Sequence, residues 1–476
     1  MNPNLGELLA ALPAAEDEPE ERLDAALLQQ LFDRLSRRRV PLGSLQRLGT
    51  LGAMQAQIFL AYAAWWVRGW FRSADHNAQA LVETQLRVAL KLVAGMSYLR
   101  GAVMKIGQTL ANLPGVVPDE IVATLEHLHF QAPPMHFALL REHVRNELGG
   151  DPEEVFAEFD PRAFAAASLG QVHRARLKSG EEVAVKIQYP GIGTSIRADF
   201  RNLFGLMLPL RVSRDWDNLQ AQLEDLRRVL EWETDYEKEA EYQRQARALF
   251  RKDDRIVVPR VYEQHSTRRV LTTELLGGVH VHAFLASNPA QELRDHFGTL
   301  ITRAWYRLFF ARHVNYADMH PGNFLFGADG RLGLLDFGCV RPFSDAEWEI
   351  MRLSIRAVEG SREDRVRYMK RSIGLTEDAS VDPEHLRLLE QFCEWCWQAV
   401  RCHGPFDFGD GQVLVEGVNV FRELTRKRYT RSEPLCVLSA RMFFGAFAMQ
   451  YRLRARVDVR AISEEEFRAA GEAALE

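Results

Sequence analysis

Lysine is scarce in this chain of 476 residues, because 52 of its 60 basic residues are arginine and only 8 are lysine. Acidic residues are slightly more numerous, which gives a formal net charge of −5. Such a chain has no global positive field of the kind that draws proteins to nucleic acid, so we expect no nucleic-acid partner. Because lysine is rare, a lysine at a motif position carries more weight than it would in an average protein.

Cysteine is also rare. Five cysteines, an odd number, are typical of a reducing compartment and exclude a disulfide scaffold. Cys393, Cys396 and Cys402 lie near His403 and could be read as metal ligands. Residues 391–397, however, have the pattern of an aromatic-rich helix, whereas zinc sites usually place spaced ligand pairs on tight turns. We therefore expect buried structural thiols.

We expect no targeting segment and no membrane span in this sequence. Residues 1–25 lack a basic segment, and residues 16–21 are almost all acidic, which argues against a signal or transit peptide. Residues 48–67 are uncharged and have about the length that crosses a bilayer, but they are rich in alanine. Tryptophans and arginines follow up to residue 72, as in interfacial anchors. We expect a helix packed on the main domain, with peripheral membrane contact as the alternative.

Periodicity divides the chain into four parts. Residues 1–40 form a polar lead-in, and residues 41–148 carry helical periodicity with few strand signals. Residues 149–277 are rich in strand signals, and residues 278–476 are again mostly helical. A helical extension, a small strand-rich lobe and a large helical lobe together predict an α+β, bilobal protein-kinase-like fold. We expect a cytoplasmic protein, at most peripheral at the inner membrane.

Short elements within these parts can also be placed. A charged helix is expected over residues 217–250. Strands are expected at residues 182–188, 257–258, 269–276, 323–326 and 332–335.

Two segments of the strand-rich part match kinase motifs for holding phosphates. Residues 183–186 read Val-Ala-Val-Lys, so Lys186 stands where a strand lysine meets the α- and β-phosphates of ATP. Residues 165–172 fall on the pattern G-x-G-x-x-G-x-V, but alanines replace the first two glycines. Alanine disfavours positive φ, so we expect the loop backbone to approach phosphates less closely. Nucleotide contacts are predicted for Ala165, Ala166, Ala167, Ser168, Gly170, Val172, Lys186, Glu274 and Leu276.

Three residues of the helical part match the catalytic motifs of kinases. Asp318 and Asn323 have the spacing of the catalytic aspartate and the metal-binding asparagine, and Asp336-Phe337-Gly338 follows. Asp318 would accept or orient the proton of the attacking hydroxyl or water, whereas Asn323 and Asp336 would hold Mg²⁺. Each motif alone is a weak signal, but all of them in this order predict a site for ATP or ADP with Mg²⁺.

The strand lysine of kinases has an acidic partner on a helix. Glu239 is the candidate, and it is predicted to be catalytic together with Asp318 and Lys186. The alternative is that Glu239 belongs to a solvated face, because residues 217–241 are rich in charge.

Taken together, these motifs resemble the UbiB/ADCK family of atypical kinases, also called AarF-like, over about residues 90–345. The resemblance rests on the alanine-rich loop at residues 165–173, the lysine strand and turn at 183–192, the catalytic loop at 318–323, K-x-G-Q at 105–108 and E-x-D at 233–235.

The resemblance implies that the helical extension folds over the active site. Lys105 and Gln108 would then point into the nucleotide pocket, and Glu233 and Asp235 would meet Lys105 in a regulatory role. It also implies that Glu239 pairs with Lys186.

The resemblance further implies ATPase behaviour or phosphoryl transfer to a small or lipid-like acceptor, in support of quinone or isoprenoid-lipid metabolism. Two alternatives remain open, a nucleotide-binding pseudokinase scaffold and a conventional protein kinase. The sequence departs from the family at Met319, where proline is usual, and it has no C-terminal pair of hydrophobic spans, since residues 441–450 are too short to cross a bilayer.

Overall fold

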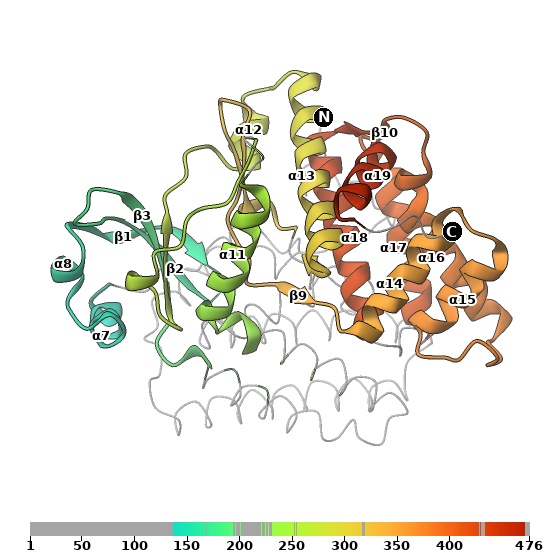
Figure 1. Cartoon of the computed structure of the whole chain (residues 1–476), viewed down its shortest axis with the longest axis horizontal. Helices are drawn as coiled ribbons and strands as arrows, with labels where there is room; N and C mark the ends of the chain where they lie inside the picture. Colours follow the sequence, from blue (N-terminus) through green and yellow to red (C-terminus); the bar gives the residue numbers. More distant parts are fainter. Residues whose placement is uncertain are drawn as a thin grey trace, which may run out of the picture.

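A computed structural model of the chain describes most of residues 137–471 (Figure 1). The gaps within this range are 168, 194–195, 197–199, 201–219, 221–223, 225–226, 228–230, 252, 254, 317–318, 428 and 430–433. The predicted site residues Lys105, Gln108, Ser168 and Asp318 lie outside the described residues, as does the segment 48–72.

The smaller lobe is built on a four-stranded antiparallel sheet in the order β1-β2-β3-β5. Its strands are β1 (Glu158–Ala167), β2 (Gly170–Arg176), β3 (Glu182–Gln188) and β5 (Val270–Glu274). Helices α7 (Phe137–Leu148) and α8 (Pro152–Val155) lie at its outer side, and α11 (Tyr236–Phe250) lies between the sheet and the larger lobe (Figure 1).

Alternation along β3 determines which way Lys186 points. Val183, Val185 and Ile187 are fully buried and pack with Leu140 and Val144 of α7. Successive side chains of a strand point to opposite faces, so Lys186 leaves the sheet on the other face, toward α11. The alternating sequence of β3 therefore positions the lysine as well as the core.

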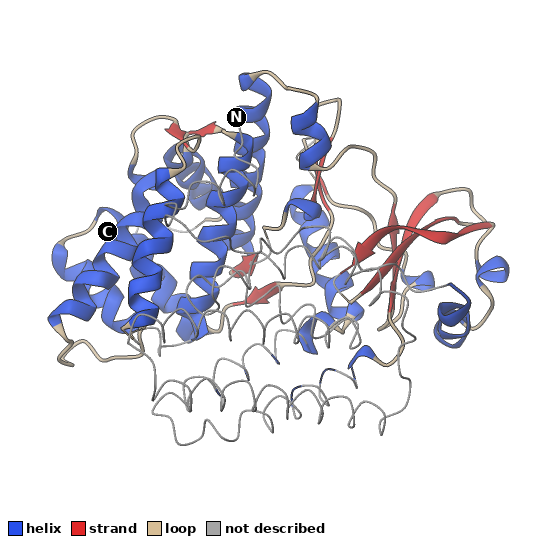
Figure 2. Cartoon of the chain, turned by 180° about the vertical axis from the view of Figure 1, so that it is seen from behind, coloured by secondary structure: helices blue, strands red, loops and turns tan. Residues whose placement is uncertain are grey.

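The larger lobe is mainly helical (Figure 2). Its long central helix α13 (Gln291–Arg312) is buried among its neighbours along most of its length. The other helices are α12 (Val281–Ala286), α14 (Asp345–Glu359), α15 (Arg362–Ser372), α16 (Pro383–Arg401), α17 (Gln412–Arg426), α18 (Pro434–Leu453) and α19 (Val459–Ala469).

Two small sheets of short strands accompany these helices. The segment β7 (Phe324–Phe326) pairs with β8 (Leu332–Leu334), and β8 pairs in parallel with β4 (Ile256–Val257). The strand β6 (Val314–Tyr316) pairs with β9 (Val340–Pro342). Two 3₁₀ turns, η2 (Glu263–His265) and η3 (Pro321–Asn323), and the pair β10 (Phe406–Asp407) and β11 (Arg456–Val457) complete the described elements.

The bilobal, kinase-like fold class is confirmed, and the five predicted strands are present within one or two residues of their expected ends. The predicted helix over 217–250 is wrong in one respect. Helical structure at 231–233 stops at Thr234, and α11 begins anew at Tyr236. The reason is Asp235, which is extended (φ −115°, ψ 91°) and caps α11 by accepting from the Lys238 amide. The four domain boundaries stay predictions.

Cys393 and Cys396 are buried within α16, as expected for structural thiols, and Cys402 lies at the C-cap of that helix. Among the described helices, none has both the length and the apolarity that a membrane span requires.

The central helix passes the C-terminal segment at Gly298, where a Cβ would lie 2.6 Å from Ala455 Cβ and 2.7 Å from Gln450 Oε1. We therefore expect Gly298→Ala to lower the free energy of unfolding by about 1–3 kcal/mol through overpacking, although alanine is the better helix former by about 1 kcal/mol. Urea unfolding followed by circular dichroism measures the effect.

Gly277→Ala is the matched control, because no atom lies within 4 Å of its added Cβ. It should change the stability by less than about 0.5 kcal/mol. If Gly298→Ala were as stable as the wild type, the close approach of α13 would be refuted.

Candidate nucleotide site

Lys186 is held by a carboxylate on the neighbouring helix. Its Nζ donates to the two carboxylate oxygens of Glu239 at 2.8 and 3.0 Å, and it lies 4.9 Å from the centre of the Tyr236 ring. Glu239 is 3% exposed, so it does not belong to a solvated face. The capped start of α11 places Glu239 one turn into the helix, opposite the middle of β3. The structure thus brings together the two residues that the sequence paired.

Asp336 reaches the same ammonium from the larger lobe. Lys186 Nζ donates to Asp336 Oδ2 at 3.2 Å, and the Gly338 amide donates to Asp336 Oδ1 at 2.8 Å. The Tyr316 hydroxyl donates to the Asp336 carbonyl at 2.9 Å. The backbone and both carboxylate oxygens of Asp336 are therefore fixed, which joins the two lobes at one point.

The electrostatics of this cluster keep the lysine charged. Burial alone lowers the pKa of Lys186, but the carboxylates of Asp336 and Glu239 outweigh it and hold that pKa well above its usual range. Burial raises the pKa of Glu239, and the Lys186 ammonium opposes that rise. With both carboxylates ionised, the three side chains carry one net negative charge, which favours a cation beside Asp336.

Asn323 and Asp336 fit a magnesium ion by the chemistry of their donors. The Leu335 amide donates to the Asn323 carbonyl at 3.0 Å, so the segment leading into Asp336 runs beside Asn323. Amide and carboxylate oxygens are hard ligands, which Mg²⁺ prefers. Within the part of the chain that the structure describes, no group of three or more His, Cys, Asp or Glu could hold a metal ion. Magnesium usually keeps waters and uses substrate phosphates as further ligands, so two protein ligands suffice.

The alanine-rich segment is more regular than a glycine-rich loop. Ala165, Ala166 and Ala167 end β1 as strand residues, paired with Val172, Gln171 and Gly170 of β2. The connection between the strands is therefore only residues 168–169. At Gly170 a Cβ would lie 2.1 Å from the Ile187 carbonyl oxygen, so glycine is required for β2 to pack on β3.

Glu274 and Leu276, the other predicted nucleotide contacts, lie at the end of β5 and just beyond it. The Glu274 carboxylate accepts from the Arg260 amide at 3.1 Å and from Arg247 Nη1 at 3.3 Å. Because the carboxylate of Glu274 already binds these two arginines, any nucleotide contact at this position would be made by the backbone of Glu274.

The predicted regulatory pair has local contacts in the structure. Cys339 Sγ donates to Glu233 Oε1 at 2.8 Å, whereas Asp235 caps α11 and lies 3.5 Å from Arg268 Nε. Their expected partner Lys105 is outside the described residues. The E-x-D segment is therefore tied to the segment after Asp336 on one side and to the helix of Glu239 on the other.

Sequence reasoning missed three residues of this site: Tyr236, Tyr316 and Cys339. Cys339 directly follows the Asp-Phe-Gly motif, and Tyr236 directly follows Asp235, so position was the only available signal for each. Nothing in the sequence pointed to Tyr316, because its partner Asp336 lies 20 residues further along the chain, between β8 and β9.

Comparisons with known proteins agree with this geometry. The profile of the ABC1 atypical kinase-like domain matches residues 127–369. The chain is 34% identical over 387 residues to the atypical kinase COQ8, mitochondrial, of Schizosaccharomyces pombe. This match covers 80% of this chain and 62% of that protein. The chain is 28% identical over 457 residues to the atypical kinase COQ8B, mitochondrial, of Danio rerio, and this match covers 93% of this chain and 71% of that protein.

A solved structure shares the fold. The complex of Rv3197 with erythromycin from Mycobacterium tuberculosis is 26% identical, with a TM-score of 0.54, and the match covers 83% of this chain and 98% of that one. The profile match spans half of the chain and includes Lys186, Glu239, Asn323 and Asp336. The chain belongs to the family of ABC1 atypical kinase-like proteins.

Proposed function

We propose that this protein binds ATP or ADP with Mg²⁺ and either hydrolyses ATP or transfers its terminal phosphoryl group to a small or lipid-like acceptor. The observation that carries the proposal is the contact of Lys186 Nζ with both Glu239 and Asp336. Phosphoryl transfer in kinases requires a lysine–glutamate pair and a metal-binding aspartate in place together. The buried lysine between two carboxylates is the arrangement that this chemistry uses.

In this proposal each residue has one role. Lys186 binds the α- and β-phosphates as a permanent cation, and Glu239 orients it. Asn323 and Asp336 hold the magnesium ion, which when bound neutralises charge on the phosphates. Asp318 accepts or orients the proton of the attacking hydroxyl or water. The alanines of β1 limit how closely the backbone covers the phosphates.

The acceptor class is inferred from the family resemblance. A helical extension with Lys105 and Gln108 over the site would obstruct a protein substrate but would admit a small or lipid-like one. We place the activity in support of quinone or isoprenoid-lipid metabolism on the same ground. Peripheral membrane contact through residues 48–72 belongs to this proposal.

A thermal melt of the purified full chain with Mg²⁺ and ADP, and then with Mg²⁺ and ATP, tests the nucleotide site. A ligand at about 100 times its Kd stabilises the folded state by about 2.7 kcal/mol, which gives a clear shift of Tm. The shift should require Mg²⁺. No shift at millimolar nucleotide would contradict the proposal, and a shift without any phosphate release or transfer would favour the pseudokinase scaffold.

The alanine-rich segment gives a second prediction. Ala165→Gly removes a Cβ and loosens the strand by about 0.5–1 kcal/mol, so we expect ATP to bind about two to five times more tightly as the backbone approaches its phosphates. Isothermal titration calorimetry measures the change. Ala163→Gly, in the same strand but farther from the turn, is the control and should leave the affinity unchanged. If Ala165→Gly bound ATP and ADP with the same affinities as the wild type does, this role of the loop would be contradicted.

A further inference from the structure

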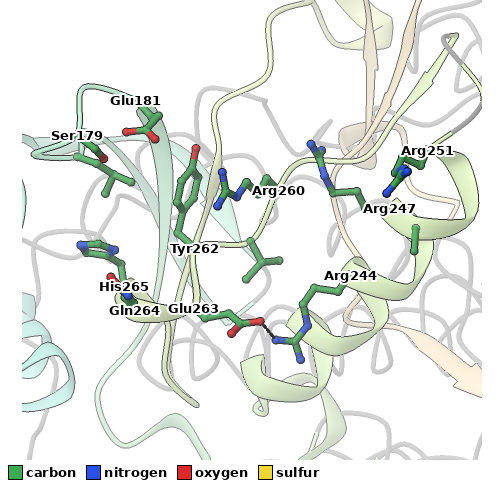
Figure 3. Close-up of a pocket in the computed structure, with 13 residues that line it drawn as sticks. Ser179, Glu181, Arg244, Arg247, Arg251, Arg260, Tyr262, Glu263, Gln264 and His265 are labelled. Atoms are coloured by element: carbon green, nitrogen blue, oxygen red, sulfur yellow. Dashed lines mark hydrogen bonds and ion pairs between the residues drawn. The ribbon is translucent and has the colours of Figure 1, made fainter.

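A cavity of about 710 Å³ lies on the side of α11 where its C-terminal half faces the smaller lobe (Figure 3). Three segments form its walls: the turn between β2 and β3, the C-terminal half of α11, and residues 260–265. None of the nucleotide-site residues described above lines it. Its volume is within the usual range for small-molecule sites.

Arginines dominate the wall of this cavity. Arg244, Arg247 and Arg251 follow one another at spacings of three and four residues, so they share one face of α11. Arg260 joins them from the facing segment. Like charges at such spacings destabilise a helix, so the arrangement has a cost unless anions compensate it.

The carboxylates in the wall do not compensate all four. Glu263 pairs with Arg244, as the dashed line in Figure 3 shows. Glu181 is the other acid of the lining. A hydrogen bond from the Ser179 side chain is the main cause that lowers the pKa of Glu181, and the charge of Arg260 lowers it only slightly. From outside the lining, Glu241 also pairs with Arg244 and Glu274 pairs with Arg247 at 3.3 Å. Among the described residues, Arg251 and Arg260 are therefore the two arginines of the wall whose guanidinium groups make no ion pair.

Arg251 and Arg260 are the groups best placed for a ligand. Among the residues that the structure describes, neither guanidinium makes an ion pair or a hydrogen bond, although that of Arg260 lies 5.1 Å from the centre of the Tyr262 ring. The negative C-terminal end of α11 favours Arg247 and Arg251, but it does not account for Arg260, which comes from another segment. Convergence from two segments is what a bound anion would explain.

We propose that this cavity is a second ligand site, which binds a molecule carrying one or more phosphate groups. Guanidinium groups recognise phosphate through paired, charge-assisted hydrogen bonds. Leu177, Val261 and the Tyr262 ring supply an apolar wall for an organic portion of the ligand. Burial lowers the pKa of His265, so this ring is neutral at neutral pH and the attraction comes from the arginines.

The test is calorimetric titration of the full chain with inorganic pyrophosphate in magnesium-free buffer. The pocket variant is Arg251→Gln/Arg260→Gln, and the control is Arg162→Gln/Arg362→Gln, which removes the same charge from exposed positions outside the cavity. We expect the wild type and the control to bind alike and the pocket variant to bind at least tenfold more weakly. Binding should also weaken as salt is added.

A second arm identifies the source of the phosphate. Co-sedimentation with phosphatidylcholine vesicles, with and without phosphatidic acid, tests a lipid headgroup, whereas pyrophosphate tests a free one. Loss of binding in the pocket variant in either arm supports the site. Equal binding by the pocket variant and the control in both arms, or no binding by the wild type in either, would overturn it. Titration of the same variant with Mg-ADP separates this result from failure of the nucleotide site, since that affinity should change less than twofold.

Discussion

Asp336→Asn should lower phosphate release or transfer at least about 100-fold, which corresponds to about 2.7 kcal/mol of transition-state stabilisation. The substitution keeps an oxygen that can accept from the Gly338 amide, so the turn after Asp336 is preserved. It removes the charge that attracts Mg²⁺ and the contact with Lys186 at 3.2 Å. Turnover at saturating Mg-ATP and the Kd for Mg-ADP are the two measurements.

Asp329→Asn is the matched control for this experiment. Asp329 also accepts a hydrogen bond from the amide two residues on, but it lies in the exposed turn between β7 and β8. It should retain the turnover and affinity of the wild type. Full turnover in Asp336→Asn would remove Asp336 from the mechanism and with it the assignment as a magnesium-dependent enzyme.

The second large effect is expected at Lys186, where Lys186→Met should destabilise the fold by about 3–5 kcal/mol at neutral pH. The variant removes the only partner that the structure shows for the Glu239 carboxylate oxygens among the described residues, while Glu239 stays buried. Breaking a buried ion pair from one side leaves an uncompensated charge, which costs more than the pair contributes. Urea unfolding of the full chain measures the loss.

A double-mutant cycle separates this cause from a simple loss of packing. Lys186→Met/Glu239→Gln has no buried charge to leave unpaired, so it should be more stable than Lys186→Met by at least about 1 kcal/mol. If the double variant were less stable than Lys186→Met, the deficit would come from packing, and the ion pair would not explain it.

The same cycle predicts a pH dependence. Burial raises the pKa of Glu239 in the folded state above its ordinary value of 4.5, and in Lys186→Met no ammonium opposes the rise. When folding raises the pKa of an acid, the folded protein loses stability as the pH rises above the pKa that this acid has in the unfolded chain. In the folded wild type the pKa of Glu239 is already raised to about 7, so the wild type and Lys186→Met lose stability in parallel below that pH. The deficit of Lys186→Met relative to the wild type should therefore grow as the pH rises above about 7, whereas that of the double variant should stay level there. A deficit independent of pH in the single variant would contradict a buried, ionised Glu239.

Much of the site could be predicted because its motifs are local in sequence. Val-Ala-Val-Lys alternates as a half-buried strand must, and this alternation also determines the direction of the lysine side chain. The two strands before Asp-Phe-Gly could be predicted from short apolar segments. The motif itself could be recognised from its three residues and its position after Asp318 and Asn323. The kinase pattern made Glu239 a candidate partner of Lys186 and the family resemblance supported it, but spacing could not decide between this pair and a solvated face, because 53 residues separate the two.

Other features depended on contacts that no local pattern contains. The break at Thr234 was missed because the charged pattern continues through residues 231–241, and only the capping geometry of Asp235 shows where α11 starts. The contact of Cys339 with Glu233 joins residues 106 apart. In sequence, the arginines of the second cavity belong to the charged helix predicted over residues 217–250 and its end, and only the fold places Arg260 from another segment in the same wall.

The sequence by itself determined the order of elements, the strand that carries Lys186 and the family to which the chain belongs, because these depend on side-chain alternation and on motifs a few residues long. Only the tertiary structure decided that Asp336 joins Glu239 at the lysine, that Tyr316 holds the backbone of Asp336, and that four arginines gather around one cavity. These are distances between segments far apart in the chain, and such distances are set by how the core packs.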